Sequence, residues 1–424
     1  MELLKTLLNK LPKPRGDKYI WAMTIILLSI SMIEVASASS RLTFGKASYL
    51  NPILSHFVHL CMGVGVIYVV HLIHYKKYKI VPVILVPLSI GLLLFLTVQG
   101  MHSQNAERWI DLKFIQLQPS ELAKLSVVMA VAFWLSKLKR DDELSQVQTF
   151  WKITVLTGVV CLLIFGENLS TAILLGAVVF FMMIIGGVAW KRLLILVAGI
   201  SSAGIVFVVI CLLVPPQTVR DSKILPARAV TWQARILDFH DDDKGDGSAR
   251  DYVRYIAPEK PQETHAKIAI ATSNVIGKMP GNSKERDYLS EATSDFIFAI
   301  IIEELGMIGG IAVVAVYLFL LFRIGRISAR CRKKYPAYLA IGLGMMLGFQ
   351  AFVNMLVAVG AIPVTGQPLP LISKGGTSIL VTSVCIGMLL GISGSLDEEE
   401  AQAMAQEQEL PAPLQENATF DKTI

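Results

Sequence analysis

Charge is scarce in this chain. Asp, Glu, Lys and Arg make up 17% of its 424 residues, whereas hydrophobic residues make up 54%. The mean hydropathy of +0.57 excludes an ordinary water-soluble protein, and the apolar runs reach the roughly 20 residues that a helix needs to cross a bilayer. The sequence also lacks the alternating segments of about ten residues that are typical of outer-membrane barrels. Since a helix satisfies its own backbone hydrogen bonds, we predict an all-α polytopic membrane protein.

Cysteine is equally rare. The five cysteines, at positions 61, 161, 211, 331 and 385, show no C-x-x-C spacing and fall within predicted spans or cytoplasmic loops. This pattern supports neither a disulfide framework nor a zinc site. Nothing in the chain resembles the S-x-x-K motif combined with K-T-G in a soluble domain, which is typical of transpeptidases. The net charge of +6 lies largely in the cytoplasmic clusters described next, so it indicates topology and contact with anionic lipid rather than nucleic-acid binding.

Hydropathy divides the chain into ten predicted transmembrane helices. They cover about 19–38, 52–74, 79–99, 120–136, 150–166, 168–188, 192–214, 294–322, 337–361 and 376–394. Clusters of Lys and Arg precede the first span and follow the second, fourth, sixth and eighth, so ten spans place them all on one side. By the positive-inside rule, both termini are expected in the cytoplasm. VASASS, at the end of the first span, resembles a signal-peptide cleavage site, but Glu34 interrupts the approach to it.

The spans define five regions of the chain. These are a basic cytoplasmic N-terminus (1–18), spans one to seven (19–214), a large extracytoplasmic loop (215–293), spans eight to ten (294–394) and a disordered cytoplasmic tail (395–424). The loop carries 12 Lys+Arg and 12 Asp+Glu, and a loop of this length is usually functional. Within it, AKIAIATSNVIG (266–277) predicts a short helix on the membrane surface. HDDDKGDG (240–247) lacks the order of a calcium loop and predicts a solvated turn.

Ionisable residues are expensive in lipid, so those in or beside a span mark candidate sites. In QPSELAK (118–124), Glu121 lies in the first turn of the fourth span and Lys124 lies one turn deeper. Glu121 has two open interpretations, as a helix-capping acid or as a substrate ligand, because an acid stabilises a helix start. Capping does not explain Lys124, since a cation opposes the positive end of the helix.

The stretch YLSEATSDFIFAIIIEELG places acids at the mouth of the eighth span and inside it. Ser294 or Asp295 could be the N-cap of this helix, which is the structural alternative. An acid at a helix N-terminus also stays ionised, and an ionised carboxylate at the membrane edge suits a general base. Glu303 and Glu304 lie roughly 12–14 Å deeper. They need partners or protons, and Lys124 is one candidate partner.

IPVTGQPLPLISKGGTSIL (362–380) interrupts the helical pattern just before the last span with prolines and glycines. Irregular backbone at membrane depth is tolerated where it lines a cavity, and a plain re-entrant turn is the alternative. Lys374, followed by two glycines, offers a cation and open backbone N–H groups, an arrangement that suits a phosphate. GENLSTAILL (166–175) is a second polar break, whose side chains could simply hydrogen-bond between helices.

Together these motifs resemble the SEDS family (shape, elongation, division and sporulation), and its cell-division members more than its elongation members. The resemblance runs over about 19–394 and rests on RWI (108–110), QPSELAKL (118–125), LSTA (169–172), GNS (281–283), SDFIFAIIIEELG (294–306) and PVTGQPLPLISKGGTS (363–378). It implies a ten-helix bundle with one large external loop. It also implies a peptidoglycan glycosyltransferase that polymerises lipid II into glycan strands, with undecaprenyl diphosphate as the leaving group.

The resemblance makes Asp295 the general base, since the catalytic aspartate of the family falls on this position. The chain departs from the family pattern nearby, because Ser290, Thr293 and Ser294 stand where proline, histidine and threonine are common. Lys374 likewise stands in place of a common tyrosine. The acid itself is kept, so its assignment as the base is unchanged.

The candidate substrate-binding residues are cations for the departing diphosphate, acids for sugar hydroxyls and polar residues of the matched motifs. The cations are Arg108, Lys124 and Lys374. The acids are Asp287 and Glu291, which could hold a divalent ion instead; no other cofactor and no metal site are expected. Glu121, Thr377 and Ser378 complete the set.

Two rival functions belong to other classes: a lipid II flippase and a non-catalytic scaffold for a partner synthase. A flippase needs a polar path across the bilayer, whereas the polar clusters here concentrate on the external side. The resemblance further implies a class B penicillin-binding protein as the transpeptidase partner, the bacterial inner membrane as location and the division septum as the place of work. An elongation polymerase is the alternative within the family.

Overall fold

The computed structural model describes residues 14–38, 50–102, 110–111, 116–166, 168–213, 261–289 and 291–408. In this part of the chain the ten long helices are α2 (Lys18–Ala38), α3 (Leu50–His71), α4 (Val81–His102), α5 (Pro119–Ser136), α6 (Glu143–Phe165), α7 (Leu169–Gly186), α8 (Trp190–Leu213), α13 (Ile297–Arg330), α14 (Lys334–Ala358) and α15 (Gly376–Gln408). The shorter elements are η2 (Tyr75–Lys79), the antiparallel strands β1 (Ile110–Asp111) and β2 (Gln116–Leu117), α12 (Pro261–Ala271) and η3 (Glu285–Asp287).

The predicted all-α, ten-span architecture is confirmed. Nine of the long helices in the described ranges have the length and composition to cross a membrane. Helix α8, with 24 residues, occupies the position predicted for the seventh span. The start of α6 was predicted too late, near 150. It begins at Glu143, because the Asp142 side chain caps it by accepting a hydrogen bond from Leu144 N at 3.0 Å.

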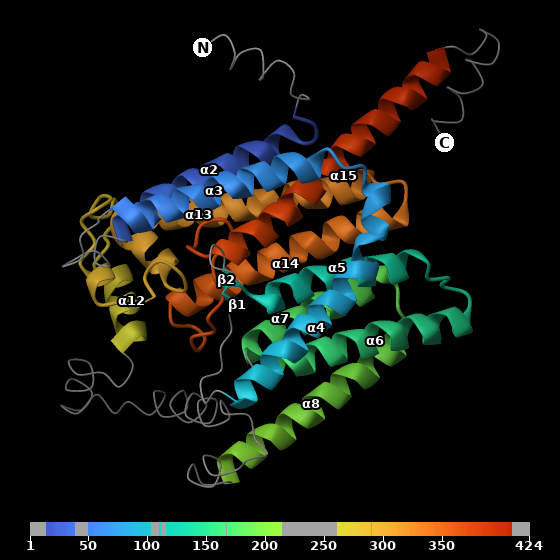
Figure 1. Ribbon diagram of the computed structural model, residues 1–424, viewed down its shortest axis with the longest axis horizontal. Helices are drawn as coiled ribbons and strands as arrows, with labels where there is room; N and C mark the ends of the chain where they lie inside the picture. The colour runs from blue at the N-terminus through green and yellow to red at the C-terminus, as the bar shows by residue number, and fades with distance from the viewer. Residues whose placement is uncertain are drawn as a thin grey trace.

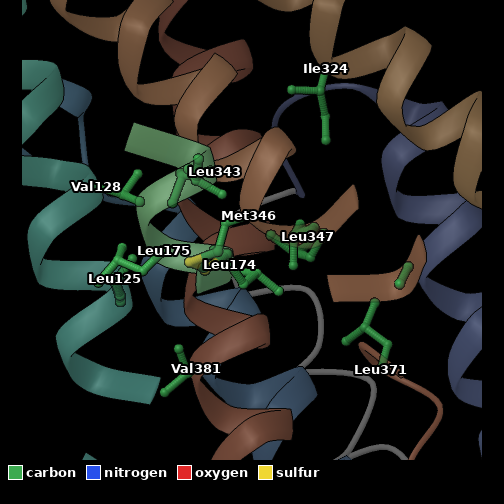
Figure 2. Packing of buried hydrophobic residues seen from close by; sticks show 14 of the residues in the cluster. Leu125, Val128, Leu174, Leu175, Ile324, Leu343, Met346, Leu347, Leu371 and Val381 are labelled. Carbon is green, nitrogen blue, oxygen red and sulfur yellow. The ribbon is translucent and has the colours of Figure 1, made fainter. Parts of the chain in front are cut away.

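Three helices form the centre of the bundle. The buried share of the apolar stretch is 89% in α15, 78% in α5 and 61% in α14, against 22% in α3 and α4. Figure 2 shows apolar side chains of α5, α7 and α14, such as Val128, Leu175 and Met346, filling the space between these helices. A Cβ on Gly342 would lie 2.7 Å from both Val128 and Met182, so glycine permits this close helix crossing.

Helix α13 is interrupted at Gly306, whose φ of 75° and ψ of −176° are not helical. An added Cβ would overlap a carbonyl oxygen of the external loop, so this position requires glycine. The loop pairs the backbone groups that the interruption frees. Lys278 N donates to Glu303 O at 3.0 Å, and Met307 N donates to Asn274 O at 3.2 Å. This part of the loop therefore replaces hydrogen bonds that α13 cannot make itself.

The short helix predicted over 266–277 is found as α12, which begins and ends earlier in the chain. Ala266 and Ala269 are buried, and α12 packs against α13. The residues after Ala271 leave the helix to pair with the interruption in α13, which is why the helix stops short of the predicted end.

Helix α15 is longer than predicted. It continues to Gln408, so the disordered tail predicted from 395 onward is wrong for the described residues. The acidic residues beyond the span pair with basic residues of other elements, as in the 2.8 Å ion pair between Asp397 and Arg330. These pairs neutralise a run of acids that otherwise favours disorder. Figure 1 shows this end of α15 projecting past the bundle, away from α12.

Candidate active site

Asp295 lies where the external loop passes into α13. A turn over 291–296 precedes the helix, which begins at Ile297 with Phe296 as its N-cap. Phe296 is fully buried, whereas Asp295 is half-buried. Because the N-cap is Phe296 and no side chain caps this helix, the alternative in which Ser294 or Asp295 is the N-cap is wrong.

The backbone beside Asp295 is held by the segment that precedes α15. Lys374 N donates to Thr293 O at 2.8 Å, and Ser373 Oγ donates to Ser294 O at 2.6 Å. Two motifs that are distant in the sequence therefore meet along adjoining backbone. The structure brings together the predicted base and one of the predicted cations.

Asn354 and Gln350 of α14 contribute to this site, and the sequence analysis did not single them out. They are 1% and 2% exposed. Asn354 Nδ2 donates to Asp295 O at 2.9 Å and to Gln367 O at 2.8 Å, while Gln350 Nε2 donates to Pro368 O at 3.1 Å. Two amides one helical turn apart inside an apolar span were the signal that could have identified them.

The segment 359–375, between α14 and α15, is irregular, as predicted. Several hydrogen bonds join it to other helices, as burial at membrane depth favours. Tyr317 OH donates to Pro370 O, and Gln367 Nε2 donates to Thr171 Oγ1 at 2.6 Å. Leu371 has a φ of 65°, a value that residues other than glycine rarely adopt. These bonds fasten the segment to α7 and α13, and whether it lines a cavity or only turns the chain stays a prediction.

Glu121 and Lys124 form a buried ion pair, with Lys124 Nζ 2.8 Å from Glu121 Oε1. Lys124 is 0% exposed, and its Nζ also donates to Gln350 Oε1 at 3.2 Å. Glu121 lies in the first turn of α5, where an acid stabilises the helix start, so the capping interpretation stands beside the ion pair. The suggested pairing of Lys124 with Glu303 or Glu304 is wrong, because its acid is Glu121. A substrate role for this buried pair stays a prediction.

Lys374 and the residues after it differ in what they offer a ligand. Lys374 is half-buried, and its ammonium group has no ion pair within the described ranges. Burial lowers the pKa of Lys374, because it disfavours the charged form. Thr377 and Ser378 are buried. The Thr377 hydroxyl donates to Gln116 O and accepts from Gln118 N at 3.2 Å, so it fastens β2 to the start of α15.

The predicted external acids lie on the surface. The Asp287 side chain is 54% exposed and lies 3.8 Å from Arg286 Nε. Glu291 is exposed, and its Oε2 accepts a hydrogen bond from Ser294 Oγ at 2.6 Å. Among the residues that the structure describes, no group of three or more His, Cys, Asp or Glu side chains could hold a metal ion. Arg108 lies outside the described residues, so its role stays a prediction.

Glu303 and Glu304 anchor the external loop to α13. Glu303 is fully buried and lies 2.6 Å from Lys278 Nζ, while Lys284 N donates to it at 3.1 Å. Glu304 is also fully buried and lies 3.8 Å from Arg286. This arrangement agrees with the expectation of a buried structural element rather than a second catalytic pair. The partners are loop cations that the sequence pattern did not identify.

These features define a class of protein: a polytopic helical membrane protein with a half-buried acid and a cation where an external loop enters the bundle. A family model described as "Cell cycle protein", which covers FtsW, RodA and SpoVE, matches residues 17–398 of the chain. The chain therefore belongs to the FtsW/RodA/SpoVE family.

Individual relatives agree with this membership. A probable peptidoglycan glycosyltransferase FtsW of Halomonas elongata is 30% identical over 92% of this chain and 93% of its own length. A probable peptidoglycan glycosyltransferase FtsW of Escherichia coli O6:H1 is 34% identical over 74% of this chain and 70% of its own.

Solved structures share the fold. The rod shape determining protein RodA of Thermus thermophilus matches with a TM-score of 0.60 at 21% identity, covering 89% of this chain and 96% of that one. A chain solved in work on the coordination of polymerization and crosslinking by a peptidoglycan synthase complex matches with a TM-score of 0.63 at 21% identity. That match covers 89% of this chain and 97% of the other.

Proposed function

We propose that this protein is a peptidoglycan glycosyltransferase that polymerises lipid II into glycan strands, with Asp295 as the general base. The observation that carries the proposal is that the backbone next to Asp295 is hydrogen-bonded to the segment that contains Lys374. The carbonyl oxygens of residues 293 and 294 accept hydrogen bonds from Lys374 N and Ser373 Oγ. A base for the acceptor hydroxyl and a cation for the departing diphosphate are the two groups that this transfer needs. The names of the FtsW relatives support the same activity.

The reaction is a single displacement at the anomeric carbon. Asp295 takes the proton of the acceptor GlcNAc 4-hydroxyl as its oxygen attacks the anomeric carbon of the donor MurNAc. The new glycosidic bond forms as the bond to undecaprenyl diphosphate breaks, and the diphosphate leaves with that electron pair. One displacement inverts the anomeric carbon from α to β, so no second nucleophilic carboxylate is needed. Lys374 stabilises the charge on the leaving diphosphate.

The surroundings of Asp295 suit this role. Its carbonyl oxygen is fixed by Asn354, and the preceding carbonyl oxygens accept bonds from Ser373 and Lys374. A base must be held within about half an ångström of its working position, and buried hydrogen bonds provide this support. Asp295 is half-buried, so we expect an acceptor sugar to reach it through its exposed part.

The protein works in the bacterial inner membrane, with both termini in the cytoplasm, at the division septum. The ion pair between Arg15 and Glu398 supports a common side for the two ends of the described chain. A class B penicillin-binding protein supplies the crosslinking activity. The likeness to a chain of a peptidoglycan synthase complex supports such a partner.

The test is polymerisation of labelled lipid II by the purified protein, with and without a class B penicillin-binding protein. Wild type is expected to produce glycan strands, and Asp295→Ala is expected to produce none. Asp141→Ala, which removes an exposed acid on another loop, is the matched control and should polymerise normally. Equal polymerisation by wild type and Asp295→Ala overturns the proposal. Lipid II translocation without polymerisation identifies a flippase instead, and neither activity identifies a scaffold.

A further inference from the structure

Glu34 is a buried carboxyl group in the membrane-spanning helix α2. It lies one turn before the helix ends at Ala38, and the residue is 0% exposed. Neither of its side-chain oxygens has a hydrogen-bond partner among the residues that the structure describes. A carboxylate is costly in such a place, because burial removes its hydration without supplying another partner. The environment of Glu34 therefore favours the protonated, uncharged acid.

Glu304 of α13 is the charged neighbour of Glu34. Helix α2 packs against α13, and Glu304 is also 0% exposed. Its Oε1 accepts a hydrogen bond from Ser37 Oγ, which lies one turn after Glu34 on α2. Its Oε2 has no partner in the described part of the chain. Two neighbouring buried carboxyl groups thus have three oxygen atoms between them without partners.

The cations of the external loop lie beside other acids than Glu34. Arg286 Nη1 is 3.8 Å from Glu304 Oε1, and Lys278 Nζ is 2.6 Å from Glu303 Oε1. One cation therefore accompanies each of the two acids of α13. Neither of these ion pairs offsets a negative charge on Glu34.

Helix α3 also packs against α2, and its titratable group on this side is His56. His56 Nε2 lies 2.9 Å from Ser31 Oγ, one turn before Glu34, and the charged neighbours of His56 are Lys374 and His59. Its other nitrogen, Nδ1, has no hydrogen-bond partner in the described ranges. His56 therefore does not supply Glu34 with a partner either.

We propose that Glu34 and Glu304 share one proton, which ties the end of α2 to α13. The protonated oxygen of Glu34 donates to Glu304 Oε2, so one hydrogen atom provides partners for two of the three oxygens. The pair then carries one negative charge instead of two, and Arg286 lies beside that charge. Loss of the proton at alkaline pH leaves two buried negative charges next to each other, which should separate α2 from α13. This inference does not depend on the proposed function.

The shared proton is expected to control how firmly the external loop is held. Ser37 Oγ accepts hydrogen bonds from Gly281 N at 3.0 Å and from Arg286 Nη1 at 3.1 Å. The turn of α2 that carries Glu34 therefore also holds this part of the loop, which continues to the turn that contains Asp295. A rise in external pH should loosen the loop beside the candidate site.

The direct test is infrared spectroscopy of the purified full-length protein in detergent. A protonated carboxylic acid has a carbonyl stretching band that a carboxylate lacks. At neutral pH, wild type should show such a band that Glu34→Gln has lost, and Glu304→Gln should shift it, because the acceptor of the hydrogen bond changes. Glu143→Gln replaces a side chain that is 91% exposed and is the control, which should leave the band unchanged. Identical bands in wild type and Glu34→Gln mean that Glu34 is ionised and overturn the proposal.

Hydrogen exchange, compared between proteins at the same pH, tests the tie to the loop. At mildly acidic pH, wild type and Glu34→Gln should protect the backbone of 278–289 equally. At alkaline pH, wild type should lose this protection and Glu34→Gln should keep it, because an amide does not ionise. Linkage gives the same sign, since the folded protein holds a proton that the unfolded chain releases, so stability declines as pH rises. Loss of protection in both proteins, or in neither, overturns the proposed tie.

Two further measurements complete the test. The other end of α2, where Asp17 pairs with Arg323, is the internal control, and its protection should be the same in both proteins. If Glu34→Gln fails to fold, wild type alone decides the matter. Its infrared band should disappear over the same range of alkaline pH in which 278–289 loses protection. A band that persists while protection is lost overturns the link between the proton and the loop.

Discussion

At the scale of single residues, the four acids between 291 and 304 occupy four different environments. Glu291 is exposed and accepts a hydrogen bond from Ser294. Asp295 is half-buried, with its backbone carbonyl held by a buried amide. Glu303 and Glu304 are fully buried and lie beside cations of the loop. One acid therefore faces solvent, one lies in the candidate site and two hold the external loop. Of the four, only Asp295 is both partly exposed to solvent and fixed by a hydrogen bond from a buried amide to its carbonyl oxygen.

Lys374 predicts a pH dependence. Burial lowers the pKa of Lys374, so its ammonium group loses its proton at a lower pH than a free lysine does. Only the protonated form attracts a diphosphate, so the polymerisation rate should decline on the alkaline side below the pH of about 10.4 at which free lysine titrates. Lys374→Arg stays charged and should remove this decline. The measurement is the initial rate across alkaline pH, and a decline that is unchanged in Lys374→Arg contradicts the assignment.

The ion pair of Glu121 and Lys124 predicts strong coupling between two substitutions. Glu121→Gln or Lys124→Met alone leaves a buried charge without its partner, which should cost about 3–5 kcal/mol of unfolding free energy. The double substitution removes both charges and should cost clearly less than the sum. Denaturant unfolding in detergent measures all four proteins. Additive losses would mean that the two charges do not depend on each other.

At the scale of elements, the interrupted helix α13 joins the bundle to the external loop. Its deeper half begins after Gly306, and the loop backbone supplies partners on both sides of the interruption. The acids Glu303 and Glu304 add side-chain contacts from the same place to Lys278 and Arg286. The loop is therefore part of the packed structure at this point, immediately before the turn that carries Asp295.

Gly306→Ala should loosen this junction. The residue has a φ of 75°, and a Cβ would overlap the carbonyl oxygen of Val275, so strain and steric overlap should together destabilise the protein by more than about 1 kcal/mol. Thermal unfolding and protease cleavage within 274–287 measure the effect. Gly325→Ala is the control, because no atom lies within 4 Å of an added Cβ there. Equal behaviour of the two variants would show that the interruption is not what holds the loop.

The extension of α15 is held by an array of ion pairs at the other end of the bundle. Each acid from 397 to 400 has a basic partner, and these partners are Arg15, Arg330 and Lys333. Hydrogen bonds to Tyr75 and Glu399 raise the pKa of Lys333 to about 12. Single exposed pairs contribute little, so the array has to act together.

Neutralising the whole array should therefore release the extension. Replacement of all four acids by glutamine is expected to increase the mobility of a spin label at Ala403 and protease cleavage beyond 395, whereas a single replacement should change little. Gln402→Ala, at an exposed position of the same helix, is the control. An extension that stays ordered without its four acids would contradict this role for the ion pairs.

At the scale of the whole molecule, the features that the sequence predicts best are those that the thickness and polarity of the bilayer determine. Ten apolar runs predict ten spans, because the length of an apolar run can be measured in one sequence. The motif around Asp295 is also a local pattern, and it places this residue at the start of α13. The interruption at Gly306 was not predictable, since IIEELGMIGG has no proline to mark a break and the loop that supplies the missing hydrogen bonds is not identified by the local sequence. The role of Asn354 likewise depends on a contact between elements far apart in the chain.

The most direct test of catalysis by Asp295 is the single-turnover rate of lipid II polymerisation by Asp295→Asn, measured together with lipid II binding. The amide keeps the size of the carboxylate but cannot accept the proton of the attacking hydroxyl, so the rate should fall by at least about a hundredfold while binding is unchanged. A protein with asparagine at this position that polymerises at the wild-type rate would contradict the assignment of Asp295 as the base.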